Sequence, residues 1–291
     1  RLECGIEIPF DKNYVTYVWF DALLNYVTAI KWDSDNDFFN SWWPADYHLM
    51  GKDIITTHAV YWMTMLMANN LSLPKHIIAH GWWLIDKTKM SKSIGNVINP
   101  IELIDHFGED SLRYFLMREM TLGQDASFSF GLFKRRYNDD LANDLGNLLN
   151  RITILIRKFC NNHVPEIKNH DEIDEDMINK INILPNESLK NIEKLKINIA
   201  IEEIMSLVRY INKYLELKEP WKILKNNNND LNGLNALSIA CEAIALSAKL
   251  LFPVMPSKCD EIFKILNIPS ESRYNLKFGQ ISGNHIQKHN V

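Results

Sequence analysis

One polar segment of the chain has the residue types that bind a polyphosphate. In Lys87-Thr88-Lys89-Met90-Ser91-Lys92-Ser93-Ile94-Gly95-Asn96, three lysines are interleaved with hydroxyl side chains, and a glycine follows them. Ammonium groups can neutralise phosphate charge while hydroxyl and backbone N–H groups donate hydrogen bonds to the oxygens. On composition alone, the commoner interpretation of such a segment is a solvated surface loop with incidental lysines.

Two shorter segments place polar side chains at the predicted ends of strands. Gly51-Lys52-Asp53 follows the apolar run Tyr47–Gly51, and His80 lies near the end of a second run, His76–Gly81. Open α/β sheets bind ligands at the carboxyl ends of their parallel strands, so Gly51-Lys52-Asp53 is a candidate for a ligand site. Structural alternatives stay open, since Asp53 can also cap the following helix and His80 can serve only the fold.

The elements that would position these residues alternate between strand and helix. Residues 14–20 are β-branched and aromatic and predict a strand, as do residues 47–51 and 76–81. A largely apolar helix is predicted over about residues 53–70, between the last two strands. Strand, long helix and strand form a βαβ unit, which implies a parallel sheet. A further helix is predicted at about residues 109–120.

The rest of the chain has a helical pattern. Asn99-Pro100-Ile101-Glu102 has the N-cap, proline and glutamate of a helix start. From Gly131 onward almost every segment predicts helix, including the apolar i, i+3, i+4, i+7 repeat from Ile201 to Leu215. A polar loop at residues 226–230 precedes another apolar helix at about 234–252. The expected fold is therefore an α/β Rossmann-type half with a parallel sheet, followed by an all-α helical bundle.

Composition excludes several classes of protein. The length of 291 residues suggests about two domains, and a net charge of -4 argues against a strongly basic nucleic-acid-coating protein. The four cysteines include no C-x-x-C pair, so neither a zinc site nor a disulfide framework is indicated. We expect no metal ligands in this segment, no membrane span and a cytoplasmic location, with an organellar address left open. The first residue is Arg1 rather than Met, and we expect the natural protein to continue upstream.

The string Lys89-Met90-Ser91-Lys92-Ser93 is identical to the KMSKS signature of class I aminoacyl-tRNA synthetases, and Gly95-Asn96 follows it. The resemblance implies a mobile loop that closes on ATP. Lys89 and Lys92 would be catalytic, because positioned cations stabilise the charge that develops on pyrophosphate as the amino-acid carboxylate attacks the α-phosphate. Lys87 lies outside the signature and is expected to be solvated.

Two further segments resemble the methionine-specific members of that class. They are Tyr17-Val18-Trp19-Phe20-Asp21-Ala22-Leu23-Leu24-Asn25-Tyr26, and Gly51-Lys52-Asp53-Ile54-Ile55 with His58 and Trp62 after it. Aromatic rings hold the polarizable sulfur of methionine well. The alternative role for Ile54 and Trp62 is packing in the core. The alternative for His58 is a buried core histidine with its hydrogen bonds made. By resemblance, the residues expected to bind methionine are Trp19, Ala22, Tyr26, Ile54, His58 and Trp62.

The same resemblance implies an ATP site. Asp53 would accept hydrogen bonds from the ribose, the backbone near Trp83 would meet adenine, and His80 would lie near the nucleotide. Gly81 would permit close approach of the backbone. The expected ATP-binding residues are Gly51, Asp53, His80, Trp83, Lys89, Ser91 and Lys92, with Mg²⁺ as the accompanying ion.

A third set of residues is expected to bind the tRNA anticodon. Asn143, Asn147 and Arg151 are spaced four residues apart, so they line one helix face, and amide and guanidinium groups can read unpaired bases. Without a family, a solvated helix face is the commoner alternative. The surrounding segment 137–147 resembles the corresponding helix of the methionine-specific synthetases. By resemblance Trp221 would stack on an anticodon base, the alternative being a buried anchor at a helix end.

The resemblance also implies a division of labour. Residues 1–125 would form the C-terminal half of a class I catalytic domain, and residues 126–291 an anticodon-binding domain. The implied activity is ligation of methionine to tRNA(Met), with L-methionine, ATP and tRNA(Met) as partners and no membrane. The family's HIGH-type motif is absent from this sequence, so this segment alone is expected to be inactive. Two alternatives remain open: a non-catalytic tRNA-binding module and a class I synthetase for another amino acid.

Overall fold

The computed structural model describes residues 6–85, 87–90 and 97–287. Two compact units make up the chain, and each is described by itself. The first comprises Arg1–Trp82 and Leu122–Asp125, and the second comprises Trp83–Thr121 and Ala126–Val291. Residues 83–121 thus belong to the second unit, whereas the predicted domain boundary lies at residue 125. The boundary at residue 125 was predicted from the expected functions of the two parts, whereas the units are defined by their compactness. It stays a prediction.

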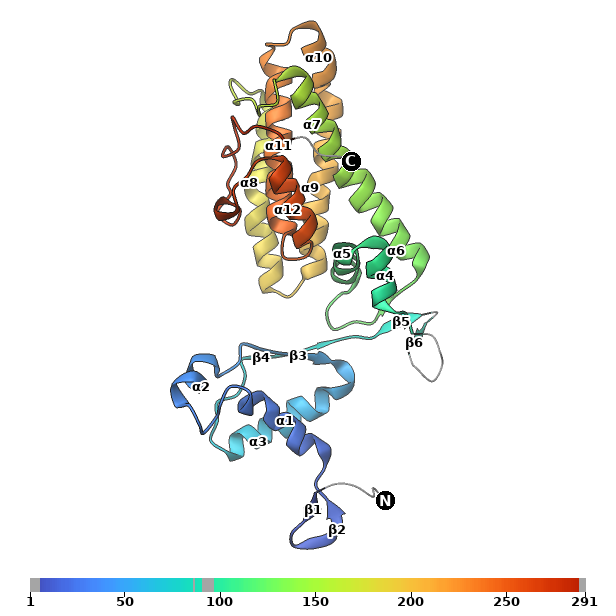
Figure 1. Cartoon of the computed structure of the whole chain (residues 1–291), viewed down its shortest axis with the longest axis vertical. Helices are drawn as coiled ribbons and strands as arrows, with labels where there is room; N and C mark the ends of the chain where they lie inside the picture. The colour runs from blue at the N-terminus through green and yellow to red at the C-terminus, as the bar shows by residue number, and fades with distance from the viewer. Residues whose placement is uncertain (1–5, 86, 91–96, 288–291) are drawn as a thin grey trace. The chain divides into compact units, whose positions relative to one another are not determined.

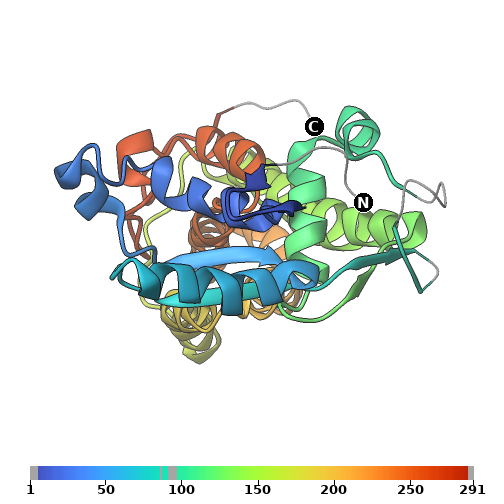
Figure 2. The ribbon, with the colours of Figure 1, turned by 90° about the horizontal axis from the view of Figure 1, so that it is seen from below.

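The first unit contains the predicted βαβ arrangement. Strands β3 (Tyr47–Gly51) and β4 (His76–His80) lie side by side (Figure 2) and pair in parallel. Gly51 lies opposite His80 in this pairing. Between them the chain is helical through η1 (Lys52–Ile54), a π-helical segment η2 (Thr57–Trp62) and α3 (Met63–Ala68). The predicted strands, the helix between them and the parallel pairing are therefore confirmed. π-helical turns occur often at functional sites.

The strand predicted over residues 14–20 is wrong in its second half. Strand β2 (Asp11–Val15) pairs with β1 (Glu7–Ile8) in an antiparallel hairpin, and helix α1 (Val18–Thr28) begins three residues after β2. Leu23 and Val27 are buried one helical turn apart, and Asp21 lies in the first turn. Burial of one helix face and an acid at the helix N-terminus outweigh the β-propensity of the aromatic residues. Helix α2 (Asn36–Trp42) completes this unit.

A small sheet and two helices begin the second unit. β5 (Trp83–Ile85) lies between β6 (Thr88–Lys89), which is antiparallel to it, and β7 (Ala126–Ser127), which is parallel. The segment predicted as a polar loop therefore begins with a short strand, because backbone pairing with β5 satisfies its polar groups. Helix α4 (Pro100–Phe107) starts as predicted, with the Asn99 side chain accepting from Ile101 N–H, and α5 (Glu109–Glu119) follows.

The remainder of the second unit is the expected helical bundle. The segments α6 (Phe130–Arg136), η3 (Tyr137–Gly146, π-helical) and α7 (Asn147–Phe159) follow one another without a break. Helices α8 (Glu172–Glu193), α9 (Ile197–Lys218) and α11 (Leu231–Leu251) pack against each other (Figure 1). The shorter segments are α10 (Pro220–Asn226), α12 (Pro256–Ile265) and η4 (Ser270–Ser272).

Helix α11 is the central helix of this bundle. By length and composition it could cross a membrane, yet 83% of its apolar window is buried inside the unit. Its side chains pack against α7, α8, α9, α10 and α12. Burial in the bundle core therefore accounts for the apolar character of this helix.

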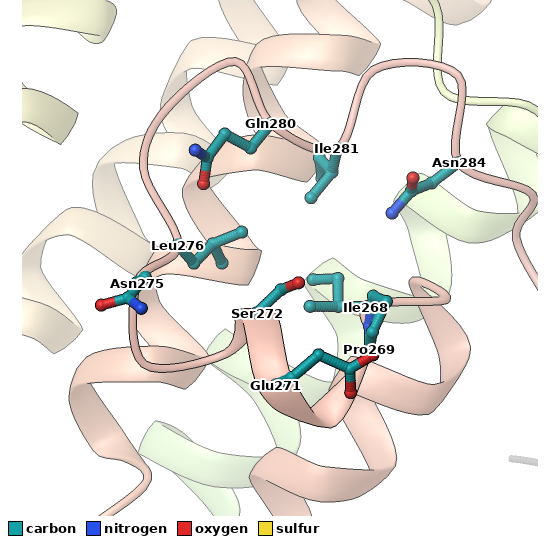
Figure 3. Close-up of a pocket in the computed structure, with 9 residues that line it drawn as sticks. All are labelled: Ile268, Pro269, Glu271, Ser272, Asn275, Leu276, Gln280, Ile281 and Asn284. Atoms are coloured by element: carbon teal, nitrogen blue, oxygen red, sulfur yellow. The ribbon is translucent and has the colours of Figure 1, made fainter.

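The C-terminal segment is attached to α11 through a buried carboxylate. Glu242 is 2% exposed and accepts hydrogen bonds from the backbone N–H groups of Gly279, Gln280 and Ile281. Gln280 and Ile281 also line a recess of about 540 Å³ between this segment and the end of α12 (Figure 3). The recess is lined by apolar and amide side chains together with Ser272 and Glu271, and it contains none of the site residues predicted from sequence.

Candidate functional site

An aromatic cluster forms where α1 meets the helical run after β3. Trp19, Ala22 and Tyr26 lie on one face of α1, because their spacing is i, i+3, i+7. The rings of Trp19 and Tyr26 lie 5.8 Å and 5.7 Å from the ring of His58, measured between centroids. The structure thus brings together three residues that were predicted to bind methionine. Ala22 is exposed on the same face of α1.

Hydrogen bonds hold His58 in one orientation. Its Nδ1 lies 2.9 Å from the carbonyl oxygen of Ile54, which can only accept, so Nδ1 carries the proton. Its Nε2 is then an acceptor, and the Tyr26 hydroxyl donates to it over 3.0 Å. His58 is 1% exposed. His58 can therefore be a buried histidine whose ring nitrogens both have hydrogen-bond partners and, at the same time, a fixed wall of a pocket.

His48 on β3 belongs to the same cluster and was missed by the sequence reasoning. Trp62 is 1% exposed, and its indole N–H donates to His48 Nε2 over 3.0 Å. The His48 ring also packs against Tyr26, with centroids 4.4 Å apart. Burial, followed by the nearby His58, lowers the pKa of His48, which keeps the acceptor nitrogen unprotonated. The sequence signal for His48 was the alternation of side chains along a strand: His48 points to the buried face of β3, whereas Tyr47 and Leu49 are exposed.

The predicted nucleotide residues of the first unit meet at the carboxyl ends of β3 and β4. Gly51 lies opposite His80 in the strand pairing. A Cβ atom at Gly51 would lie 2.7 Å from the Asp53 carboxylate oxygen and 3.7 Å from the His80 ring, so glycine allows these side chains to approach the backbone. Asp53 is exposed, and the His80 Nδ1 lies 2.8 Å from Gly81 O. The three groups therefore surround one exposed strand end.

The other predicted nucleotide residues belong to the second unit. Trp83 packs its ring 5.6 Å from that of Phe115, in an aromatic core beside β5. Lys89 is exposed on β6 and pairs with Leu84 in the strand register. Ser91 and Lys92 lie outside the described residues. The backbone at Trp83 and the side chain of Lys89 thus occupy neighbouring strands of one small sheet.

Three of the four predicted anticodon residues, Asn143, Asn147 and Arg151, line a polar recess of about 370 Å³ in the second unit. Asn143 and Asn147 are exposed, and the Asn147 amide lies 3.5 Å from the Asn143 side-chain oxygen. Arg151 donates to the side-chain oxygen of Asn212 on α9. Trp221 is absent from the residues that line this recess. It is half-buried at the start of α10 and packs against the bundle core.

The opposite wall of that recess was not predicted. It comes from α9, whose residues Arg209, Asn212 and Glu216 face Asp144 and the predicted residues. Their spacing is i, i+3, i+7, so a polar stripe on α9 was the sequence signal that could have revealed them. Arg209 NH1 lies 3.6 Å from the Asp144 carboxylate. The recess therefore offers amide, guanidinium and carboxylate groups, which suit hydrogen bonding to nucleotide bases.

Among the residues that the structure describes, no group of three or more His, Cys, Asp or Glu side chains could hold a metal ion. The cysteines Cys160, Cys241 and Cys259 are free thiols, and burial raises the pKa of each of them. Cys4 lies outside the described residues.

Parallel strands with ligand candidates at their carboxyl ends, the lysine-rich KMSKS segment in the sequence and a helical bundle are features of a class I tRNA synthetase. The family model described as "tRNA synthetases class I (M)" matches residues 1–153, more than half of the chain. The chain belongs to this family. A second model, "Anticodon-binding domain of tRNA ligase", matches residues 174–285.

Individual relatives agree with this assignment. The chain is similar to the methionine–tRNA ligase of Clostridium acetobutylicum, with 41% identity over 99% of this chain and 45% of that protein. The Bacillus subtilis methionine–tRNA ligase is 38% identical over 98% of this chain and 44% of its own length. The solved structure of Mycobacterium tuberculosis methionyl-tRNA synthetase in complex with methionyl-adenylate matches with a TM-score of 0.92 and 33% identity, covering 99% of this chain and 58% of that one. The chain thus spans less than half the length of these curated relatives.

Proposed function

We propose that the whole protein to which this chain belongs is a methionine–tRNA ligase. The carboxylate oxygen of methionine attacks the α-phosphorus of ATP, the bond to the β-phosphate oxygen breaks, and methionyl-adenylate and pyrophosphate result. A ribose hydroxyl at the tRNA 3′ end then attacks the methionyl carbonyl, and AMP leaves. The observation that carries the proposal is the convergence of Trp19 and Tyr26 on His58, which follows Asp53 by five residues in the helical run after β3.

In the first step, one group of residues binds methionine and another binds the nucleoside of ATP. The aromatic cluster binds the methionine side chain, since flat rings suit a flexible thioether and its sulfur. Trp62 and Ile54 support that pocket, Trp62 from the core and Ile54 through its carbonyl bond to His58. Asp53 accepts from the ribose hydroxyls of ATP, and the backbone at Trp83 meets the adenine.

Lys89 and Lys92 act on the phosphates. Their ammonium groups stabilise the negative charge that develops on the leaving pyrophosphate, and the Ser91 hydroxyl donates a hydrogen bond to the same oxygens. Mg²⁺ enters as the counter-ion of ATP, because the phosphate oxygens themselves are its preferred ligands.

In the second step the helical bundle selects the tRNA. Asn143, Asn147 and Arg151 read anticodon bases from the polar recess, and Trp221 supplies a stacking surface. The cytoplasmic location expected from the sequence is part of this proposal.

The test uses the full-length protein. Methionine-dependent exchange of pyrophosphate into ATP is expected, with little exchange when isoleucine, leucine or valine replaces methionine, and methionine should be charged onto tRNA(Met). Exchange driven by another amino acid would replace this proposal with a different class I specificity. Binding of tRNA without any exchange would identify a non-catalytic tRNA-binding module.

A further inference from the structure

The short segment Leu122–Asp125 is docked against the end of β4. A Cβ atom at Gly81 would lie 2.0 Å from the carbonyl oxygen of Gln124 and 2.6 Å from the backbone nitrogen of Asp125. Both contacts are to backbone, which cannot move aside as a flexible side chain can. Gly81 therefore permits an approach between two chain segments that any other residue would prevent.

The Asp125 carboxylate connects two turns of the first unit. Its Oδ1 accepts from the Trp82 backbone N–H over 2.8 Å and lies 2.6 Å from the Lys52 ammonium. The same ammonium lies 4.0 Å from the centroid of the Trp82 ring. The hydrogen bond from Lys52, and then that from Trp82, lower the pKa of Asp125, so the carboxylate is charged at neutral pH. Asp125, Lys52 and Trp82 thus form a closed triangle, in which Trp82 bonds to the carboxylate through its backbone N–H and contacts the ammonium through its ring.

The triangle lies beside the proposed ATP residues. Lys52 stands between Gly51 and Asp53 in the turn after β3, and Trp82 follows His80 by two residues in the turn after β4. The backbone pairing of the strands ends with Gly51 and His80. Beyond that pair, Asp125 supplies a side-chain link that holds the two turns together. We propose that Asp125 is a positioning residue for the nucleotide site, which aligns Asp53 and His80 by joining Lys52 to Trp82.

The inference rests on the proposed function and predicts which substrate is affected. The aromatic cluster has its own hydrogen bonds, from Tyr26 to His58 and from Trp62 to His48, and none of them involves Asp125. Loss of the Asp125 link should therefore impair the use of ATP and leave methionine binding unchanged. A displacement of about 1 Å in a binding group can cost on the order of 10²-fold in rate.

The chain offers a matched control at the other end of the same strands. Asp46 and Lys75 also form a 2.6 Å ion pair, immediately before β3 and β4 respectively. This pair joins the same two strands at their amino ends, away from Asp53 and His80. Asp46→Ala therefore removes a similar ion pair from the same unit without touching the proposed nucleotide site.

The experiment compares Asp125→Ala, Asp125→Asn and Asp46→Ala in the full-length protein. In methionine-dependent exchange, Asp125→Ala should lower kcat/KM for ATP by about 10-fold to 100-fold, with the methionine Kd within twofold of wild type. Asp125→Asn keeps an acceptor for Trp82 N–H and should recover part of the loss. Asp46→Ala should match wild type.

A second measurement does not depend on turnover. ATP should raise the melting temperature of wild type and Asp46→Ala, and raise it less in both Asp125 variants, because stabilisation follows the fraction of protein that binds ligand. If Asp125→Ala does not fold, both measurements are made on Asp125→Asn alone.

An unchanged response to ATP in both assays would overturn the proposal. So would tighter ATP binding by Asp125→Ala, which would mean that Asp125 competes with the phosphates for Lys52. Wild-type protein without methionine-dependent exchange would instead refute the proposed function, while the melting measurement still tests Asp125.

Discussion

The Tyr26 hydroxyl donates a hydrogen bond to Nε2 of His58 over 3.0 Å, and this bond joins α1 to the helical run after β3. The carbonyl of Ile54 holds the other ring nitrogen of His58, so the ring cannot turn without losing a partner. Two segments that lie about thirty residues apart in sequence therefore meet at a histidine with one fixed tautomer. A rigid wall of this kind suits a pocket that must select one amino-acid side chain.

Removal of the Tyr26 hydroxyl tests this wall. In full-length protein, Tyr26→Phe should weaken methionine binding by about fivefold, because a typical hydrogen bond contributes about 1 kcal/mol and its loss frees the His58 ring. Equilibrium titration with methionine measures the effect, and ATP binding should not change. Tyr61→Phe is the matched control, since Tyr61 is exposed on the same helical run. Equal methionine affinity in both variants would show that Tyr26 and His58 do not form part of the methionine pocket.

The lysines of the KMSKS string should act mainly in the transition state. Lys92→Ala and Lys89→Ala should each slow methionine-dependent exchange by up to about 10²-fold, by analogy with oxyanion donors, while methionine binding stays near wild type. Lys87→Ala is the control, because this exposed lysine lies two residues before the string. Exchange as fast as wild type in the Lys89 and Lys92 variants would show that the segment has no catalytic role.

Anticodon recognition should be separable from adenylate formation. Trp221→Ala removes a stacking surface worth about 1–3 kcal/mol per base, so charging of tRNA(Met) should fall while exchange remains intact. Arg151→Ala should behave similarly, since it removes a guanidinium from the polar recess. Trp221→Phe should restore part of the charging rate, because it retains an aromatic face. Wild-type charging by a normally folded Trp221→Ala protein would make this residue a structural anchor only.

A buried ion pair at the end of α9 should contribute strongly to the free energy of unfolding. The Lys218 side chain is 5% exposed, and its ammonium lies 2.7 Å and 2.8 Å from carboxylate oxygens of Asp171 and Asp174. Asp174 is fully buried and also accepts from the Tyr214 hydroxyl. Lys218→Met would leave Asp174 without its cation, at a cost of about 3–5 kcal/mol in the free energy of unfolding.

Urea unfolding followed by circular dichroism measures that cost. Lys222→Met is the control. Lys222 lies four residues after Lys218 and forms an ion pair with Glu219, in which both side chains are exposed. Exposed pairs contribute little, so this variant should unfold like wild type. Equal stability of the two variants would contradict the prediction.

Glu242 should make the stability of the bundle depend on pH. Burial raises its pKa in the folded state, and the backbone N–H groups of residues 279–281 only partly oppose this shift. The folded protein therefore holds the proton more tightly than the unfolded chain. The stabilising contribution is complete below the unfolded pKa and is lost as pH rises through the raised folded pKa.

Glu242→Gln removes this titration. Relative to wild type, the free energy of unfolding of the variant should increase as pH rises from about 4 to neutrality, because only the wild type loses the contribution of Glu242 over this range. Glu261→Gln serves as control, because Glu261 is exposed in α12. A difference between Glu242→Gln and wild type that stays constant across this pH range would contradict the predicted shift.

Local patterns in the sequence were sufficient for several features of this protein. The period of the apolar residues predicted the bundle, and the alternation of two strands with a long apolar helix predicted the parallel pairing of β3 and β4. Asn143, Asn147 and Arg151 were placed on one face because helical spacing is a property of the chain itself. The KMSKS string could be recognised for a similar reason, since its residues are contiguous.

The tertiary structure decided what depends on partners that are distant in sequence. Residues 18–20 have strand propensity but start a helix, because Leu23 and Val27 gain more from burial on one helix face than the aromatics gain from a strand. His48 enters the aromatic cluster through a bond from Trp62, and α9 supplies the second wall of the polar recess. Asp125 meets Lys52 and Trp82 only because the chain returns to the end of β4. Local periodicity cannot encode such contacts, because they depend on how packed elements bring remote side chains within hydrogen-bonding distance.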